Sequence, residues 1–334
     1  MIVLILQRFD LSTVSCARRV LSEARELSAR GHRVMIVDFP HDERRSQFST
    51  FASFQRNSIR TIRLSRRAVD TYRNCRTVID LDPQPDIVHL WKSYPDAALP
   101  ALVAADHSGA PLHYDWDDWE PAIAHELTGS RLAAHLARLW DRAILGACDS
   151  CSVASKRIRE FALDWGMPED RIWDAPVGAD IGLFQPRPPD TEILERIGNP
   201  RIPILVYVGQ LEVATYAETA VDVISILRER GTPVHLLVIG GGRYEERLRK
   251  AAEEKGVSEF VTCTGYVPGD EVPRWLSVGT VGLAPFQDTL VAQCKSPLKI
   301  AEYLAMGLPV VASDVGDARV MVENAGLLCP PGDA

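Results

Sequence analysis

The chain has 334 residues, of which 46% are hydrophobic and 25% are charged, and its formal net charge is −8. This composition is typical of soluble globular proteins, and the length favours two domains over one. Because nucleic-acid binders need a broad basic surface, the acidic balance argues against nucleic acid as a partner.

Seven cysteines are scattered along the chain, and no secretory leader precedes the first strand-like run. We therefore expect reduced thiols and a cytoplasmic location. Cys148 and Cys151 have the spacing of a redox or zinc motif, but neither a second such pair nor a nearby histidine completes a metal site, so we interpret them as structural. No apolar run approaches the roughly 20 residues that span a bilayer, so we do not expect an integral membrane protein.

The first half of the chain alternates apolar, strand-like runs with helical segments. We predict strands at residues 1–7, 32–39, 58–65, 86–91, 111–116 and 149–155. A helix from about Val14 to Ala29, stopped by Gly31, would join the first two strands. Such alternation is typical of parallel sheets that are covered by helices on both faces.

An arginine-rich segment follows the second predicted strand. Residues 44–76 contain nine arginines and a single acid, Asp70, so the local charge is near +8. Arginine binds phosphates and carboxylates through its planar guanidinium. Four of the arginines are candidates for binding an anionic ligand or anionic lipid headgroups: Arg60, Arg63, Arg66 and Arg67. The alternative is a solvated helix face and loop, part of which is a surface strand because Ile62 and Leu64 alternate with arginines. The sequence leaves both interpretations open.

An acidic cluster follows the fifth predicted strand. Four carboxylates fall within six residues, at Asp115, Asp117, Asp118 and Glu120. On an extended chain Asp115 and Asp117 project to the same face, as in a metal-binding Asp-x-Asp pair. Acidic clusters are also common in ordinary polar loops, which is the alternative.

The second half of the chain repeats the alternating pattern. Residues 186–203, rich in proline and charge, are the predicted linker, and strands are predicted at 204–209, 234–240, 259–265, 280–286, 309–313 and 325–329. The predicted fold class is α/β, with two Rossmann-like, doubly wound parallel-sheet domains (1–185 and 204–334) that face a cleft. Ligands bind such sheets at the carboxyl ends of the strands, so the loops near Gly209, Gly240, Gly265, Pro285 and Ser313 should line the site.

Residues 295–313 predict a capped helix followed by a buried strand. Ser296 is a good N-cap, Pro297 suits the first helical position, and Gly307 suits a left-handed exit. The apolar face of the helix would consist of Leu298, Ala301, Leu304 and Ala305.

The start of this helix is a candidate phosphate site. Its unpaired amides and positive dipole end, with Lys295 and Lys299 alongside, suit an anion. Glu302, one turn further on, can accept hydrogen bonds from paired hydroxyls such as a ribose diol. The alternative is an ordinary helix whose charged side chains are solvated.

Residues 296–311, SPLKIAEYLAMGLPVV, resemble the donor-site motif of the retaining glycosyltransferases of the GT-B fold, in family 4. Further segments agree in the same order: Gly178-Ala179-Asp180 with Phe184 and Pro186, VYVGQL at 206–211, HLLVIGGG at 235–242 and FVTCTGYVP at 260–268. The resemblance covers most of the chain. It implies transfer of a sugar from a nucleoside diphosphate sugar to an acceptor, with retention of configuration.

The resemblance also implies roles for particular residues. The donor would lie in the loops of Gly209, Gln210 and Gly240, with its base at Tyr266 and its ribose at Glu302. Its phosphates would meet the helix start, which comprises Lys295, Ser296, Pro297, Leu298 and Lys299. Asp117, Lys299 and Glu302 are the candidate catalytic residues, with Asp117 near the sugar or the acceptor.

The resemblance further implies which partners to expect. GT-B enzymes generally hold the diphosphate without metal, so we expect neither a metal ion nor a cofactor. The N-terminal half would bind the acceptor, which can be a glycan, a lipid-linked molecule or a small molecule. In several family members this half also contacts the membrane, so peripheral contact at its inner face is a further expectation.

Several positions depart from the family pattern. Gln210 and Tyr216 stand where the family usually has Arg and Lys, Cys294 stands in place of the first of two glutamates, and Asp117 with Asp118 replaces a His-Asp pair. Each lost charge-assisted hydrogen bond costs about 1.5–3 kcal/mol, unless Lys295 and Lys299 replace it.

Two alternatives to a transferase therefore remain. One is a non-catalytic nucleotide-sugar-binding or partner subunit, and the other is a nucleotide-sugar epimerase of the same fold. Relatives usually continue beyond the sequence GLLCPPGDA at 326–334, so we expect the donor domain to lack the usual final helices.

Overall fold

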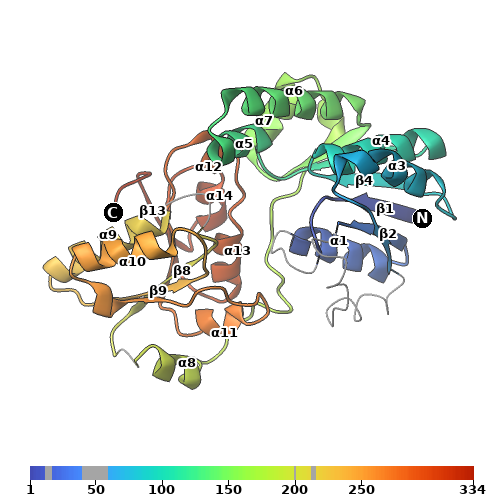
Figure 1. Cartoon of the computed structure of the whole chain (residues 1–334). Coiled ribbons are helices and arrows are strands. Elements are labelled where there is room, and N and C mark those ends of the chain that lie inside the picture. Colours follow the sequence, from blue (N-terminus) through green and yellow to red (C-terminus); the bar gives the residue numbers. More distant parts are fainter. Residues whose placement is uncertain (12–16, 40–58, 199–200, 212–215) are drawn as a thin grey trace. The chain divides into compact units, whose positions relative to one another are not determined.

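The computed structural model describes residues 1–11, 17–39, 59–198, 201–211 and 216–334. The chain divides into two compact units, Met1–Pro176 and Val177–Ala334, each built on one parallel sheet (Figure 1). The predicted class, two doubly wound α/β domains, is confirmed. Within the stretch 186–203, predicted as a linker, the structure has a short helix, α8 (Thr191–Arg196), whose Ile193 is buried in the core of the second unit.

The first unit has a seven-stranded sheet in the order β3-β2-β1-β4-β5-β6-β7. Its strands are β1 (Ile2–Leu6), β2 (Arg33–Asp38), β3 (Ile59–Arg63), β4 (Ile87–Trp91), β5 (Leu112–Trp116), β6 (Ser150–Val153) and β7 (Ile172–Asp174). The six predicted strands are present, and the three-residue β7 was missed. The order reverses between β1 and β4, which is the switch point where doubly wound sheets bind ligands.

Helices cover both faces of this sheet, with α1 on one side and α3 and α4 on the other (Figure 1). The helices are α1 (Ala17–Ala29), α3 (Thr71–Ile79), α4 (Pro95–Ser108), α5 (Glu120–Thr128), α6 (Arg131–Ala147) and α7 (Lys156–Asp164), with 3-10 turns at Ala68–Asp70 and Glu169–Arg171. The hydroxyl of Ser130 caps α6 by accepting from the Ala133 amide at 3.1 Å. Gly31, with φ +86°, follows α1 as predicted, and residues 14–16 of the predicted helix lie outside the described residues.

The second unit has a six-stranded parallel sheet in the order β10-β9-β8-β11-β12-β13. Its strands are β8 (Ile204–Val208), β9 (His235–Ile239), β10 (Val261–Cys263), β11 (Val281–Ala284), β12 (Val310–Ser313) and β13 (Gly326–Cys329). All six were predicted. The switch point lies between β8 and β11.

The helices of the second unit, besides α8, are α9 (Tyr216–Glu229), α10 (Glu245–Glu254), α11 (Val272–Leu276), α12 (Leu290–Gln293), α13 (Leu298–Ala305) and α14 (Ala318–Val322), with a 3-10 turn at Ser258–Phe260. In the described part of the chain, no helix is both long and apolar enough to cross a membrane.

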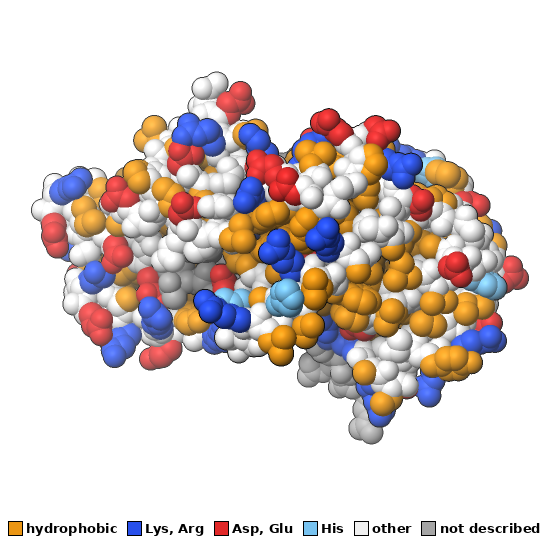
Figure 2. Space-filling view, turned by 90° about the horizontal axis from the view of Figure 1, so that it is seen from above, with side chains coloured by type: hydrophobic (Ala, Val, Ile, Leu, Met, Phe, Trp, Pro, Cys, Tyr) orange, Lys and Arg blue, Asp and Glu red, His pale blue; other side chains and the backbone are white. Residues whose placement is uncertain are grey.

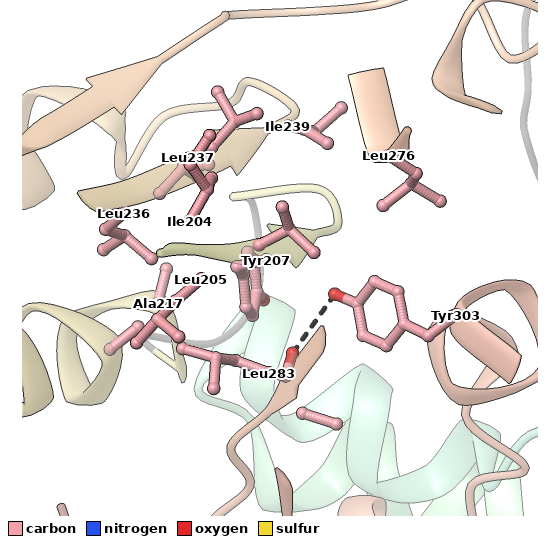
Figure 3. Packing of buried hydrophobic residues seen from close by; sticks show 14 of the residues in the cluster. Ile204, Leu205, Tyr207, Ala217, Leu236, Leu237, Ile239, Leu276, Leu283 and Tyr303 are labelled. Carbon is pink, nitrogen blue, oxygen red and sulfur yellow. Dashed lines mark hydrogen bonds between the residues drawn. The ribbon is translucent and has the colours of Figure 1, made fainter. Parts of the chain in front are cut away.

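Tyr303 connects α13 to β8 and β11, the two strands of the switch point in the second sheet, and Figure 3 shows its hydrogen bond to Leu283 of β11. Its hydroxyl accepts from the Val208 amide at the end of β8 (2.8 Å) and donates to the Leu283 carbonyl of β11 (3.2 Å). The ring is fully buried and lies over Gly282, where an added Cβ would come within 2.4 Å of the ring. Gly282 is therefore required by the close approach of α13 to β11.

The buried face of α13 differs from the predicted one. Ile300 and Tyr303 are fully buried, whereas Leu298, Ala301, Leu304 and Ala305 are only half-buried. The prediction of the buried face from hydrophobic residues alone was wrong. The Tyr303 hydroxyl makes its hydrogen bonds inside the core, so this tyrosine can be buried more deeply than the small and aliphatic residues around it.

We expect Tyr303→Phe to lower the free energy of unfolding by about 1–3 kcal/mol, because it leaves the Val208 amide and the Leu283 carbonyl without their buried partner. Urea denaturation followed by circular dichroism measures this. Tyr266→Phe is the matched control, since Tyr266 is 79% exposed and should shift stability by less than about 0.5 kcal/mol. Equal stability of the Tyr303→Phe variant and the wild type would refute the role given to this hydroxyl.

Candidate functional site

Lys299 lies at the carboxyl end of β8, although it belongs to α13. Its Nζ is 3.8 Å from the centroid of the Tyr207 ring and 5.5 Å from that of Phe286. A Cβ added to Gly209 would come within 3.3 Å of the same Nζ. The ammonium is thus held between two aromatic rings and the glycine turn that follows β8, an arrangement that favours a cation.

The surroundings of Lys299 lower its pKa to about 7. Burial is the largest cause, and the neighbouring charge of Lys295 adds to it, while Glu302 acts in the opposite direction. Glu302 itself is 5% exposed. An anion placed beside Lys299 would favour the charged form of the lysine, so this position can change its charge near neutral pH on binding a phosphate.

The start of α13 differs from its prediction. The helix begins at Leu298, Pro297 is the N-cap residue, and no side chain caps the first amides. The Ser296 hydroxyl instead accepts from the Val177 amide at 3.0 Å, so the predicted capping role of Ser296 is wrong. Pro297 is extended and separates Ser296 from the first helical residue, so Ser296 lies one residue too early to cap the helix. Gly307, with φ +76°, ends the helix as predicted.

Glycines bring the ends of β8, β9 and β10 together. A Cβ on Gly240 would lie 2.1 Å from the Gly209 carbonyl oxygen, and one on Gly241 would lie 2.9 Å from the Tyr266 nitrogen. Gly240 also forms an isolated bridge with Gly265. Glycine at 240 is therefore needed for backbone packing, and the same contacts gather the loops of Gly209, Gly240 and Tyr266 at one edge of the sheet.

The remaining donor-site candidates of the second unit differ in exposure. Gln210 is exposed, and the Tyr266 side chain is 79% exposed. Lys295 and Leu298 are half-buried. The side chain at position 216 and residues 212–215 lie outside the described part of the chain.

In the first unit, the acidic cluster surrounds a lysine that the sequence did not single out. Lys92 directly follows β4, is 5% exposed and has a left-handed backbone, with φ +61°. Its Nζ lies 2.6 Å from Asp118, 2.9 Å from Glu120 and 3.3 Å from Asp117. A lysine that is held in this strained conformation and faces three carboxylates indicates a functional site rather than a solvated loop.

Within the acidic cluster, Asp117 is the carboxylate whose pKa lies near neutral pH. It accepts a hydrogen bond from the Trp91 indole at 3.1 Å and faces Lys92. Its pKa is raised to about 7, chiefly by burial, with Lys92 opposing the shift and Asp118 adding to it. Glu120, which also pairs with Lys92, accepts a further hydrogen bond from the Tyr94 hydroxyl at 2.5 Å.

Asp115 is bound by a different cation from the one that faces Asp117. Arg19 of α1 donates to both oxygens of Asp115, at 2.6 and 2.7 Å, and the Ser152 hydroxyl donates at 2.6 Å. This pair attaches α1 to the sheet. Asp115 and Asp117 therefore have separate partners and do not form a joined pair, which is the reason to reject the Asp-x-Asp metal interpretation.

A second group near Asp115 has the spacing of metal ligands. Glu23, His89 and Asp115 each place one ligand atom within 4.8 Å of the others, and Nε2 of His89 is 3.4 Å from Glu23. Arg19 already occupies both oxygens of Asp115, however, and lies 3.4 Å from Glu23. Burial lowers the pKa of His89 to about 4 and raises that of Glu23 to about 8. The group is therefore best described as a buried polar network around Arg19.

The four candidate arginines do not share one face. Arg60 and Arg63 are both exposed on the edge strand β3, but three residues apart they project to opposite sides of the sheet. Arg67 lies 3.9 Å from Asp70, and Arg66 is half-buried, with its pKa lowered by burial and by Arg8. The arginines at 44, 45 and 56 lie outside the described residues.

The sequence analysis did not identify Lys92 and Arg19 as partners of the acidic residues, because a single basic residue at a strand end or on a helix forms no recognisable sequence pattern. The one sequence feature that could have revealed the pairing of Lys92 is the opposite charge on two neighbouring loops. Lys92 follows β4, the acidic cluster follows β5, and the ends of adjacent parallel strands lie side by side.

Two family profiles match the chain. One, described as glycosyl transferases group 1, matches residues 202–334, and the other, a glycosyl transferase 4-like domain, matches residues 16–178. The two matches together cover most of each unit.

Curated relatives agree with these profiles. A GDP-mannose-dependent alpha-(1-6)-phosphatidylinositol monomannoside mannosyltransferase of Mycobacterium tuberculosis is 31% identical over 204 residues, which are 60% of this chain and 52% of the relative. An alpha-D-kanosaminyltransferase of Streptomyces kanamyceticus is 25% identical over 203 residues, 60% of this chain and 48% of the relative. The chain thus spans about half the length of these relatives.

Solved structures share the fold over the whole chain. The structure of Anabaena HepE in complex with UDP and glucose has a TM-score of 0.73 at 16% identity, covering 100% of this chain and 86% of that one. WaaG, a glycosyltransferase involved in lipopolysaccharide biosynthesis, has a TM-score of 0.67 at 16% identity, covering 100% and 87%. At such identities the similarity concerns the fold alone.

We expect Lys92→Met to lower the free energy of unfolding by about 3–5 kcal/mol at pH 7, because it leaves buried carboxylates without their cation. Lys92 opposes the effect of burial on Asp117, so without it the raised pKa of Asp117 rises further; the added cost is present at neutral pH and diminishes as the pH falls and Asp117 becomes protonated.

Urea denaturation at pH 7 and pH 4.5 measures this difference. Lys250→Met is the matched control, because the Lys250 side chain is 72% exposed and its nearest acid is Glu254 at 3.7 Å. A Lys92→Met variant that is no less stable than the control at pH 7 would contradict the assignment of Lys92 as the counter-ion of the cluster.

Proposed function

Because the chain belongs to the GT-B glycosyltransferases of family 4, we propose that it transfers a sugar from a nucleoside diphosphate sugar to an acceptor, with retention of configuration and without a metal ion or cofactor. The observation that carries the proposal is the position of Lys299. A cation from α13 lies beside Gly209, at the switch point of the second sheet, where ligands of doubly wound folds bind.

Lys299 can replace the charge that the family usually has at position 210. Gln210 is neutral and directly follows Gly209, whereas the Lys299 ammonium is within 3.3 Å of the place a Gly209 side chain would take. The positive charge is therefore supplied at the same turn, but from a different element. An ammonium fixed there stabilises the negative charge that develops on a departing diphosphate.

The rest of α13 complements the diphosphate and the ribose. The uncapped first amides of the helix and Lys295 supply further donors and charge on the phosphate side. Glu302, buried one turn later, is placed to accept from ribose hydroxyls, and the exposed ring of Tyr266 offers a surface for the base. In the transfer, the acceptor oxygen bonds to the anomeric carbon, the bond from that carbon to the diphosphate oxygen breaks, and the acceptor loses its proton.

Asp117 is the proposed sugar or acceptor contact of the first unit. With a pKa of about 7 it can accept from a hydroxyl when ionised and donate to one when protonated. Lys92 acts on it as a positioning residue, since its ammonium lies 3.3 Å from Asp117 and also pairs with Asp118 and Glu120.

The names of relatives suggest donors and acceptors to test first. Two mycobacterial relatives are GDP-mannose-dependent, and the Anabaena structure contains UDP and glucose, so GDP-mannose and UDP-glucose head the panel. A lipid-linked acceptor has precedent in the phosphatidylinositol monomannoside of the first relative, and glycans and small molecules complete the set. The proposed location is cytoplasmic, as expected from cysteines that are scattered and odd in number.

A non-catalytic nucleotide-sugar-binding subunit is the second candidate. It is favoured by the neutral Gln210 and by Cys294, which is fully buried where the family has a glutamate. Binding without turnover distinguishes it from the transferase.

The decisive measurement is nucleoside diphosphate release from GDP-, UDP-, TDP- and ADP-sugars, with and without cell extract as acceptor. We expect release from one donor that depends on the extract, and at least a tenfold lower kcat/KM in Lys299→Met, because one charge-assisted contact to the leaving diphosphate is lost. Lys250→Met, an exposed lysine on α10, is the control. The anomeric configuration of the product, determined by NMR, tests retention.

Two results would speak against the proposal. Saturable donor binding without release would favour the binding subunit. Donor conversion without any acceptor would favour an epimerase.

Donor affinity should also depend on pH through Lys299. The lysine is protonated below its pKa of about 7, so the affinity for an intact nucleotide sugar should fall above pH 7, by up to about tenfold per pH unit. The diphosphate diester of the donor does not titrate in this range, so the change reports the protein. Isothermal titration calorimetry from pH 6 to pH 8.5 measures it. Lys299→Met should give a weak but flat profile, and a profile as steep as that of the wild type would assign the titration to another group.

A further inference from the structure

Glu245 lies beside the loop that is proposed to hold the nucleoside base. It is the first residue of α10, the helix that follows the glycine turn after β9. A Cβ added to Gly265, the residue before Tyr266, would come within 3.9 Å of Oε2 of Glu245. Because Gly265 forms an isolated bridge with Gly240, the carboxylate lies at the edge of the sheet where the ends of β9 and β10 meet.

Arg249 fixes the position of this carboxylate. One turn further along α10, its guanidinium donates to Oε1 of Glu245 at 2.8 Å and to the main-chain carbonyl of Cys263 at 3.4 Å. Cys263 is the last residue of β10, so the arginine joins the side chain of Glu245 to the strand that leads into the base loop. Each oxygen of a carboxylate has two lone pairs, so a carboxylate that accepts from one arginine can accept further hydrogen bonds.

Glu245 differs from the other acids of α10 in being half-buried. Its side chain is 26% exposed, whereas Glu246, Glu253 and Glu254 are exposed. Acidic and basic side chains are interspersed at the left of Figure 2, the side on which α9 and α10 lie in Figure 1. A surface of mixed charge does not select a ligand by its overall field, so selectivity at this edge has to come from a group that is held in place.

A fixed carboxylate distinguishes guanine from the other common bases. Guanine presents two adjacent donors, N1–H and the N2 amino group, and the two oxygens of a carboxylate can accept from them side by side. Uracil and thymine place a single N–H between two carbonyl oxygens, and adenine places an acceptor nitrogen beside its amino group. A carboxylate that faces one of these edges therefore meets an acceptor. Opposed or unpaired polar groups of this kind are what cause a site to reject the wrong ligand.

We propose that Glu245 selects a guanine nucleotide as the sugar donor, with its carboxylate accepting from N1–H and the N2 amino group of the base. Arg249 is a positioning residue, because it acts through Glu245. The inference rests on the proposed function, which places the base at the loop of Tyr266. It adds the identity of the base. Lys299 and the exposed ring of Tyr266 do not specify that identity, because a phosphate contact and a stacking surface suit every nucleoside diphosphate.

Calorimetric titration of the chain with GDP, IDP and UDP tests the proposal. IDP is the matched ligand, because its base differs from guanine only in lacking the N2 amino group. We expect GDP to bind at least about tenfold more tightly than IDP or UDP, since one charge-assisted hydrogen bond is worth roughly ten- to a hundredfold in affinity. Glu245→Gln should weaken GDP binding by a similar factor and bring the ratio of GDP to IDP affinity close to one, because the amide has only one accepting oxygen.

Two further variants separate recognition of the base from a structural effect. Glu246→Gln is the matched control, because Glu246 is the next residue of α10 and is exposed, and it should keep the wild-type preference for GDP. Arg249→Met should lower the ratio of GDP to IDP affinity only in part, since the carboxylate remains but loses the contact that fixes it. A merely structural role of Glu245 or Arg249 would change the affinities for all three nucleotides equally and leave their ratios as they are. Thermal melts show that each variant is folded.

Either of two results would overturn this inference alone. They are equal affinity of the wild type for GDP and UDP, and a ratio of GDP to IDP affinity that Glu245→Gln leaves unchanged. Both leave a nucleotide site in place, so the proposed transferase function stands. Absence of saturable binding for all three nucleotides would instead contradict the donor site itself, and the inference about its base would fail with it.

Discussion

The position of α13 depends on one hydroxyl group. Tyr303 joins the end of β8 to β11 through two hydrogen bonds inside the core, and its ring occupies the space that Gly282 leaves free. Lys299 and Glu302 lie one turn or less from this contact, so their positions relative to the strand ends follow from it. The phosphate contact proposed for Lys299 needs a fixed location more than it needs a particular element, and a tyrosine in the core supplies that fixed location.

In the first unit, buried ion pairs hold the elements of the candidate site in place, whereas in the second unit a buried hydroxyl does so. Arg19 attaches α1 to Asp115, and Lys92 gathers three carboxylates at the ends of β4 and β5. Buried ion pairs add little net stability, because desolvation offsets most of their attraction. Their value lies in specifying geometry. In Lys92 this is visible in the backbone, which adopts a left-handed conformation that a lysine takes only when its surroundings enforce it.

Much of the fold could be predicted from the sequence, because strands buried on both faces are continuous apolar runs between turns, as in IVLIL of β1 and HLLVI of β9. The short β7, IWD, has no such run and was missed. The candidate site could be predicted less completely from the sequence. The left-handed helix exit at Gly307 was predicted correctly. Ser296 was wrongly predicted as the N-cap, because the helix starts one residue later than expected and Pro297 takes that position.

Contacts between distant segments account for the rest. Arg19 and Asp115 are 96 positions apart, and nothing in either segment alone indicates that they pair. The amphipathic character of α6 was also passed over, although RLAAHLARLWDRAILGA contains it, because a helix that alternates leucine and arginine looks like an ordinary surface helix until its leucines prove to be exposed. Periodicity gives the rows of a helix, and only the fold shows which row is covered.

The environment of Lys299 has a consequence for its chemistry as an amine. A lysine with a pKa of about 7 is largely a free base in mildly alkaline solution, whereas ordinary lysines remain ammonium ions there. Acylating reagents react only with the free base, so near neutral pH a larger fraction of this amine than of an ordinary lysine is in the reactive form. A diphosphate bound beside Lys299 would raise its pKa and favour the ammonium form. Binding at the site could therefore be measured as a slower rate of covalent labelling of Lys299.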